Sequence, residues 1–122
     1  MTAILEPTNS TTPTRMARSE PARIVDVRTV PYAIPYRKPL RFASGSIDVA
    51  DNVLVEIVTS TGVVGIAEAP PRPYTYGETQ DSIMAVIKQV FAPAIIGLSI
   101  LDREEARRRL AQIGRASCRE RV

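Results

Sequence analysis

The stretch that decides the fold is VLVEIVTSTGVVGIAEA, residues 53–69. Residues 53–59 are almost all β-branched or aliphatic, which is the composition of a strand, and residues 63–69 return as a second apolar run. The Ser-Thr-Gly of residues 60–62 favours a tight turn between them, because glycine adopts a positive φ without steric cost. The stretch therefore predicts an antiparallel hairpin.

Upstream of this hairpin the chain predicts one more strand and a long loop. Residues 24–34 alternate apolar and polar side chains, as a half-buried strand does. Residues 36–52 contain a Pro, a Gly, two Ser and two Asp and show no sustained period. We expect a loop there, and loops longer than about 12 residues are usually functional or disordered. This loop is a candidate site.

Downstream of the hairpin we expect a second loop and then a helix. Residues 70–78 contain three prolines, which indicate neither a paired strand nor a helix. Thr79 is suited to cap a helix that runs to about Ala92, because apolar residues follow at helical spacing. We expect Pro93 to end that helix.

A last helix is expected to begin at Asp102. Glu105 lies three residues further on, as in a capping box, and Ala106 and Leu110 form an apolar stripe. Three strands followed by helices predict an α+β fold, in which helices cover one side of a three-stranded antiparallel sheet.

Composition excludes several classes of protein. The chain has 122 residues, too few for a catalytic barrel of roughly 200 or more. It has no His and one Cys, which excludes His-based acid–base catalysis, Ser-His-Asp triads and Cys/His zinc sites. No apolar run approaches the ~20 residues of a membrane span. The net charge of +3 arises mostly outside residues 22–112, so neither a membrane nor a nucleic acid is an expected partner.

Charged residues in three places have a chemical and a structural interpretation. Glu68 ends a strand alone, which favours a structural hydrogen-bond acceptor over an acid–base catalyst. Three arginines at residues 107–109 follow two glutamates at helical spacing, which favours ion pairs over contacts to nucleic acid. A basic cluster lies at the start of the first loop: Arg37, Lys38 and Arg41. It is either an anion contact or a solvated surface, and the second is favoured.

Both ends of the chain look unlike the rest. Residues 1–21 are rich in Thr, Ser and Pro without a period, so we expect a disordered leader, and either Met1 or Met16 is the true start. Residues 113–122, IGRASCRERV, can be encoded in one reading frame by the start of a widely used sequencing adapter. We expect this tail to be an artefact and exclude it from the domain.

Five stretches of the chain, taken in order, carry a family resemblance. They are residues 24–27 IVDV, 36–40 YRKPL, 54–69 LVEIVTSTGVVGIAEA, 76–79 YGET and 92–97 APAIIG. Together they resemble the N-terminal capping domain of the mandelate racemase and muconate lactonizing enzyme family, within the enolase superfamily. The resemblance implies that residues 22–112 are such a domain.

Within the family, the Lys38-Pro39-Leu40 element and the proline-rich loop favour the muconate-lactonizing subgroup. The implied whole protein is a muconate cycloisomerase-like isomerase. The same subgroup holds dipeptide epimerases and o-succinylbenzoate synthases, which remain alternatives. A stand-alone binding module and a regulatory interaction domain are alternatives of another class.

The resemblance also implies a division of labour. In that family a C-terminal barrel supplies the acid–base lysines and the acidic ligands of Mg²⁺, which stabilises the enolate formed when a proton α to a carboxylate is removed. None of those positions exists in this chain, so we expect no catalytic residue, no metal site and no activity here. The implied whole protein is cytoplasmic and homo-oligomeric and takes a small carboxylate substrate.

The cap of that family lends its loops to the barrel mouth, where they exclude water and contact the distal part of the substrate. By this resemblance the two loops of the present chain shape specificity. The implied substrate-binding residues are Leu40, Phe42, Ile47 and Tyr76.

Overall fold

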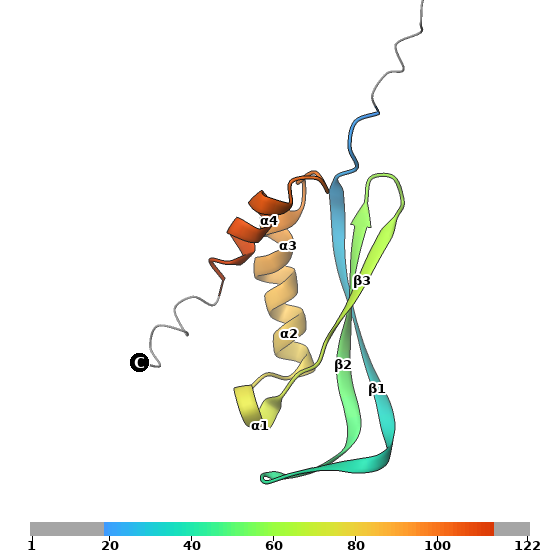
Figure 1. Cartoon of the computed structure of the whole chain (residues 1–122), viewed down its shortest axis with the longest axis vertical. Coiled ribbons are helices and arrows are strands. Elements are labelled where there is room, and N and C mark those ends of the chain that lie inside the picture. Colours follow the sequence, from blue (N-terminus) through green and yellow to red (C-terminus); the bar gives the residue numbers. More distant parts are fainter. Residues whose placement is uncertain (1–18, 114–122) are drawn as a thin grey trace, which may run out of the picture.

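The computed structural model describes residues 19–113. The leader and the adapter-like tail therefore lie almost wholly outside the described residues, and both stay predictions. The described chain forms a three-stranded antiparallel sheet in the order β1-β2-β3 (Figure 1). The strands are β1 (Ile24–Phe42), β2 (Gly45–Thr59) and β3 (Val64–Ala69).

Short helices follow the sheet and lie along one side of it (Figure 1). They are α1 (Pro73–Tyr76), α2 (Gln80–Val86), the π-helical turn η1 (Ile87–Phe91), α3 (Ala92–Ile95) and α4 (Arg103–Leu110). This arrangement confirms the predicted α+β fold. Among the described residues, no helix has the length and apolar content needed to cross a membrane.

The hairpin of residues 53–69 is present as predicted. Val53 pairs with Ala69 and Val58 with Val64, so the two strands are in continuous register. The turn closes where the amide of Gly62 donates to the carbonyl of Thr59 at 3.0 Å. Gly62 has a φ of 85°, which is the left-handed conformation that the turn requires.

The predicted loop over residues 36–52 is wrong, because β1 and β2 continue as a paired ribbon through most of it. Pro35 faces Val49 and, after an irregularity in β1, Leu40 faces Ile47. Most side chains of the ribbon are exposed. A period of two arises only where one face of a sheet is buried, so a two-sided exposed ribbon has no such pattern. Its far end bends toward the helix side, beneath α1 (Figure 1).

The core is small and lies between the sheet and the helices. Val53 is fully buried, and Ala92 and Ile95 in α3 are buried with it. On β3, Val64 and Ile66 remain 45% and 69% exposed. The described part of the chain therefore leaves apolar sheet surface uncovered.

The expectation that Pro93 ends the helix after Thr79 is wrong. Helical backbone continues from α2 through η1 and α3 to Ile95. The amide of Ala92 donates to the carbonyl of Ile87, five residues back, which is the bond of a π turn. Such a turn widens the helix just before Pro93, where the ring would otherwise collide with the preceding turn. Proline is therefore tolerated inside this helical run.

Helix α1 corrects the expectation that the prolines of residues 70–78 exclude a helix. Pro73 occupies the first helical position of α1, where its missing N–H would have no partner in any case. Gly77 ends α1 in the left-handed conformation, with a φ of 73°. One helical turn therefore lies inside the proline-rich loop.

Helix α4 begins after Asp102 as predicted, but the expected capping box is wrong. Asp102 makes no side-chain cap, and Glu105 instead accepts hydrogen bonds from Arg108 and Arg109 at 2.6–2.8 Å. These ion pairs confirm the interpretation of the arginine run. The bond from Arg108, followed by that from Arg109, lowers the pKa of Glu105 from 4.5 to about 2. Two guanidinium groups outcompete one backbone amide for this carboxylate.

Candidate functional site

Two adjoining cavities lie between the end of the β1–β2 ribbon and the proline-rich loop. The larger, which we call the inner cavity, has a volume of about 450 Å³. The smaller, which we call the tip cavity because it reaches the ribbon tip, has a volume of about 350 Å³. Both are lined by Ile47, Arg72, Pro73 and Tyr74. The bend of the ribbon thus brings together the two segments that the sequence singled out as loops.

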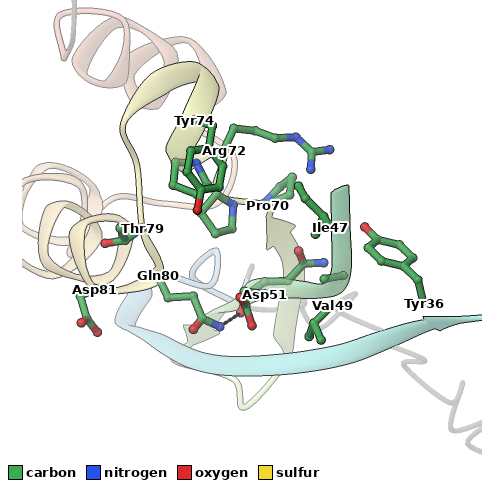
Figure 2. Close-up of a pocket in the computed structure, with 14 residues that line it drawn as sticks. Tyr36, Ile47, Val49, Asp51, Pro70, Arg72, Tyr74, Thr79, Gln80 and Asp81 are labelled. Atoms are coloured by element: carbon green, nitrogen blue, oxygen red, sulfur yellow. Dashed lines mark hydrogen bonds between the residues drawn. The ribbon is translucent and has the colours of Figure 1, made fainter. Parts of the chain in front are cut away.

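The inner cavity has walls of different character. Figure 2 shows Thr79, Gln80 and Asp81 on one side, at the start of α2, and Ile47, Val49 and Tyr36 of the ribbon on the other. Charged side chains of both signs line it: Arg72, Asp51 and Asp81. This cavity can therefore take a polar or apolar group, and its two carboxylates disfavour an anion.

The tip cavity differs in charge. Its described lining residues are Phe42, Ser44, Gly45, Ser46, Ile47, Arg72, Pro73, Tyr74 and Thr75. Among these, Arg72 carries the one charge and four others carry hydroxyl groups. In Figure 2 the Arg72 side chain extends from the proline-rich loop toward the strand that carries Ile47.

Gln80 fastens the helix side of the inner cavity to the ribbon. Its Nε2 donates to the carbonyl of Tyr32 at 3.0 Å and to that of Asn52 at 2.8 Å, the latter drawn in Figure 2. Tyr32 and Asn52 face each other across β1 and β2. One amide group therefore holds both strands at the level where the ribbon begins to leave the sheet.

The start of α2 is itself well determined. The Thr79 hydroxyl accepts from the Ser82 amide at 3.2 Å, and the Ser82 hydroxyl accepts from the Thr79 amide at 2.8 Å. This reciprocal cap confirms the prediction that Thr79 caps the helix. It also places Gln80 and Asp81 in the first turn, where they line the inner cavity.

Glu68 has a hydrogen-bonding role on the sheet. The Tyr32 hydroxyl donates to Glu68 Oε1 at 2.5 Å and accepts from Asn52 Nδ2 at 3.3 Å. The bond to Glu68 raises the pKa of Tyr32 above its ordinary value, because it favours the protonated phenol. Glu68 lines neither cavity, and this agrees with its predicted structural role.

The four residues implied as substrate-binding fall in different places. Ile47 lines both cavities, and Phe42, 51% exposed, lines the tip cavity. Leu40 and Tyr76 line neither. Leu40 lies opposite Ile47 on β1. The substrate-binding role of all four stays a prediction.

Tyr74, and not Tyr76, is the tyrosine of α1 that lines the two cavities. Both belong to α1, and two residues along a helix are about 200° apart around its axis. Tyr74 therefore lines both cavities, whereas Tyr76 lines neither.

Sequence reasoning missed Arg72, Asp51 and Gln80 as lining residues. Of these, Arg72 carried a usable signal, since a cation between two prolines has a restricted backbone. The basic cluster of Arg37, Lys38 and Arg41 lines neither cavity. Within residues 19–113, no three His, Cys, Asp or Glu side chains are grouped so that they could hold a metal ion. The described residues therefore do not fit a Mg²⁺ site.

The family model for the N-terminal domain of mandelate racemase / muconate lactonizing enzyme matches residues 24–118. By structure, the chain is similar to a muconate lactonizing enzyme from Mycobacterium smegmatis complexed with muconolactone, with 58% identity and a TM-score of 0.69 over 74% of this chain and 25% of that one. It is also similar to a dipeptide epimerase from Enterococcus faecalis complexed with Mg and L-Leu-L-Tyr, with 32% identity and a TM-score of 0.67 over 75% of this chain and 25% of that one.

By sequence, the chain is 35% identical over 82 residues to the L-Ala-D/L-Glu epimerase of Bacillus subtilis, covering 67% of this chain and 22% of the epimerase. The chain thus spans about a quarter of the length of the relatives it matches.

Proposed function

Since the chain belongs to the mandelate racemase / muconate lactonizing enzyme family, we propose that it forms the capping part of an enzyme that removes a proton α to a carboxylate. In this proposal the remainder of the enzyme supplies the acid–base groups. The present chain supplies the walls that surround the distal part of a small carboxylate substrate. The observation that carries the proposal is the pair of adjoining cavities between the ribbon and the proline-rich loop.

A muconate cycloisomerase-like reaction is the favoured activity. Its support is the higher identity to the muconate lactonizing enzyme of M. smegmatis than to the E. faecalis dipeptide epimerase, over a similar share of the chain. Dipeptide epimerisation is the second candidate, supported by the match to the B. subtilis epimerase. Both reactions make or break a C–H bond at the carbon α to a carboxylate group, so one kind of cap could serve either.

Mg²⁺ is proposed as the cofactor of the whole enzyme. Its support is the Mg-complexed dipeptide epimerase among the structural neighbours. When bound, Mg²⁺ would stabilise the negative charge that develops on the substrate carboxylate. The described residues of this chain offer no ligand set for it, so no step of the reaction is assigned to them.

In this proposal the cap acts through shape and exclusion of water. Ile47 and Phe42 present apolar surface to the cavities, and the ribbon tip and α1 form the outer wall. Leu40 and Tyr76 are proposed to contact substrate only when the remainder of the enzyme lies beneath the cap. The homo-oligomeric state and the cytoplasmic location of the whole protein stay predictions from the sequence.

The test is a chimera. Residues 22–112 of this chain replace the matching N-terminal quarter of the M. smegmatis muconate lactonizing enzyme. The conversion of muconate is then measured with Mg²⁺ and with EDTA. We expect Mg²⁺-dependent turnover by the chimera, and none by the remainder of that enzyme alone or by the 122-residue chain alone.

A folded chimera that leaves muconate unchanged would contradict the favoured activity. If the same chimera epimerised L-Ala-L-Glu, the second candidate would replace the first. Turnover of either substrate by the 122-residue chain alone would overturn the assignment of this chain as a cap without catalytic groups.

A further inference from the structure

Strand β3 forms one edge of the sheet, and its outer side has no partner among residues 19–113 (Figure 1). Its inner side pairs with β2. Within the described chain, no backbone hydrogen bond joins residues 64–69 to any other segment. The side chains of β3 are exposed, except that of Ala69, which is partly buried. The outer side of β3 is therefore open to another strand.

The register of the β2–β3 hairpin determines which backbone groups face this edge. The amide of Thr59 donates to the carbonyl of Val63 at 3.0 Å, so these two residues form a hydrogen-bonded pair. Hydrogen-bonded and non-hydrogen-bonded pairs alternate along an antiparallel ladder, so the next pair, Val58 with Val64, is not hydrogen-bonded. Every second residue of β3 therefore directs its N–H and C=O groups away from β2, and these residues are Val64, Ile66 and Glu68.

The opposite edge of the sheet, formed by β1, is protected. At the start of β1, the amide of Ile24 donates to the carbonyl of Leu98 at 2.9 Å, and the carbonyl of Ile24 accepts from the amide of Gly97 at 2.8 Å. Further along, β1 contains three prolines, which lack the N–H that a neighbouring strand would need. They are Pro31, Pro35 and Pro39. Prolines and charged side chains are common means by which proteins prevent a sheet edge from pairing.

Strand β3 lacks this protection. It contains no proline and no lysine, and Glu68 is its one charged residue. The carboxylate of Glu68 accepts a hydrogen bond from the hydroxyl of Tyr32 on β1 at 2.5 Å, so it is directed across the sheet and not toward the edge. An exposed strand edge without such protection is suited to pair with another chain.

The sequence of β3 is complementary to itself about a two-fold axis at Ile66. In that antiparallel register, Ile66 of one copy lies opposite Ile66 of the other, and Val64 lies opposite Glu68. The backbone groups of these residues point outward, so each such pair exchanges two N–H···O bonds. No two carboxylates lie opposite each other. On the other face of the sheet Gly65 lies opposite Ala67, so no large side chain obstructs the pairing.

We propose that β3 pairs with β3 of a second copy of this chain, so that the two sheets join into one continuous sheet. The pairing would also bring together the two Ile66 side chains, each of which is 69% exposed in a single chain. Residues 64–69 line neither cavity, so this interface is separate from the site of the proposed function.

The first test is hydrogen exchange of the backbone amides of the 122-residue chain. It is measured at two concentrations, at which sedimentation velocity shows mostly monomer and mostly dimer. We expect the amides of Val64, Ile66 and Glu68 to exchange at least about tenfold more slowly in the dimer, because only there do they have a partner. The amides of Gly65 and Ala67 bond to β2 in both states, so they should gain less protection and are the internal control.

Charged variants of Ile66 test the two-fold register. Ile66→Lys and Ile66→Glu each place like charges opposite each other in the dimer, and each should weaken dimerisation at least about fivefold. A mixture of the two variants should associate at least about fivefold more tightly than either alone, because opposite charges then lie opposite each other. The matched control is Val30→Lys, an exposed position on β1 away from the β3 edge, which should leave dimerisation within about twofold.

Three results would overturn the proposal. A chain that stays monomeric up to about 1 mM, where even weak contacts are populated, would leave the edge to another partner, such as the remainder of the enzyme. A dimer in which the amides of Val64, Ile66 and Glu68 exchange as fast as in the monomer would exclude edge pairing. Equal losses in Ile66→Lys and Val30→Lys would assign the association to the sheet face. If the Ile66 variants did not fold, hydrogen exchange of the native chain would decide.

Discussion

At the scale of single residues, Gln80 joins the start of α2 to two strands of the sheet. It is the first residue of α2, and its side chain donates to one carbonyl on β1 and one on β2. A side chain from a helix, rather than a neighbouring strand, thus supplies a donor to each of these two strand carbonyls. The inner cavity depends on this bridge, because it holds the start of α2 against the ribbon.

Replacing Gln80 by Ala should therefore cost stability. The variant leaves the carbonyls of Tyr32 and Asn52 without these donors, and we expect the free energy of unfolding to fall by about 1–2 kcal/mol. Urea unfolding measures this. The control is Gln89→Ala on η1, an exposed glutamine that makes no side-chain hydrogen bond within the described residues, and it should change stability by less than about 0.5 kcal/mol. Equal losses in both variants would contradict the bridging role.

At the scale of elements, the β2–β3 hairpin and α4 show how local chemistry sets local structure. Gly62 and Gly65 stand three residues apart, and a Cβ added at either would meet no atom within 4 Å. Of these two glycines, Gly62 has a positive φ and Gly65 does not. Since neither position is crowded, a difference in stability between alanine variants at the two positions would reflect backbone strain.

Gly62→Ala should destabilise the chain by about 1–2 kcal/mol, since an L-residue is strained in the left-handed conformation. Gly65→Ala lies within β3 and should leave stability unchanged or raise it slightly, because alanine loses less backbone entropy than glycine on folding. Thermal unfolding of both variants beside the native chain tests the pair. A loss at Gly65 as large as that at Gly62 would show that the turn conformation is not the cause.

Helix α4 should respond to acid through Glu105. Its pKa in the folded chain is about 2, below its usual 4.5, so the ion pairs stabilise α4 fully above about pH 4.5 and this stabilisation is lost as the pH falls through about 2. Carboxyl chemical shifts followed against pH measure the titration. Arg108→Gln should move the pKa of Glu105 upward, because the bond from Arg108 is the larger cause.

The control for that experiment is Arg103→Gln at the start of α4, which makes no hydrogen bond or ion pair to Glu105. It should leave the titration of Glu105 nearly unchanged. An equal upward movement in the Arg103 and Arg108 variants would assign the effect to net charge rather than to the contact.

At the scale of the whole molecule, the helices cover one face of the sheet and part of the other stays bare. Val64 and Ile66 of β3 are largely exposed, as is Val30 of β1 at 45%. Exposed apolar surface of this kind favours self-association or contact with a partner that covers it. In the proposed function the remainder of the enzyme is a candidate for that partner, so the 122-residue chain alone should be marginally stable.

We expect the isolated chain to unfold below about 60 °C and to self-associate. The double variant Val64→Thr with Ile66→Thr should reduce association and leave the unfolding temperature nearly unchanged, since both side chains already face solvent. Sedimentation velocity and thermal unfolding test both parts. The contrast is Val53→Thr, which places a hydroxyl at a fully buried position and should cost about 1–3 kcal/mol.

Much of the architecture could be predicted from local patterns in the sequence. Three features depend on neighbours within a few positions of the chain: the hairpin of residues 53–69, the cap at Thr79 and the ion pairs of Glu105. The local sequence therefore predicts them. Five ordered stretches also sufficed to suggest the family, which the family match then bore out. Local spacing failed at Pro73 and Pro93, because a proline that fits the first turn of a helix, or follows a π turn, looks the same in a sequence as one that breaks it.

The makeup of the two cavities depended on contacts between distant segments. Residues 36–42 and 45–52 carry no period because both faces of their ribbon are exposed, so nothing in them indicated pairing or the bend toward α1. That bend, together with the rotation of α1 about its axis, puts Arg72 and Tyr74 beside Ile47 and turns Tyr76 away. Local propensity reflects how a residue fits its own helix or strand. A cavity wall instead depends on how elements far apart along the chain are placed, and packing and long-range hydrogen bonds determine that placement.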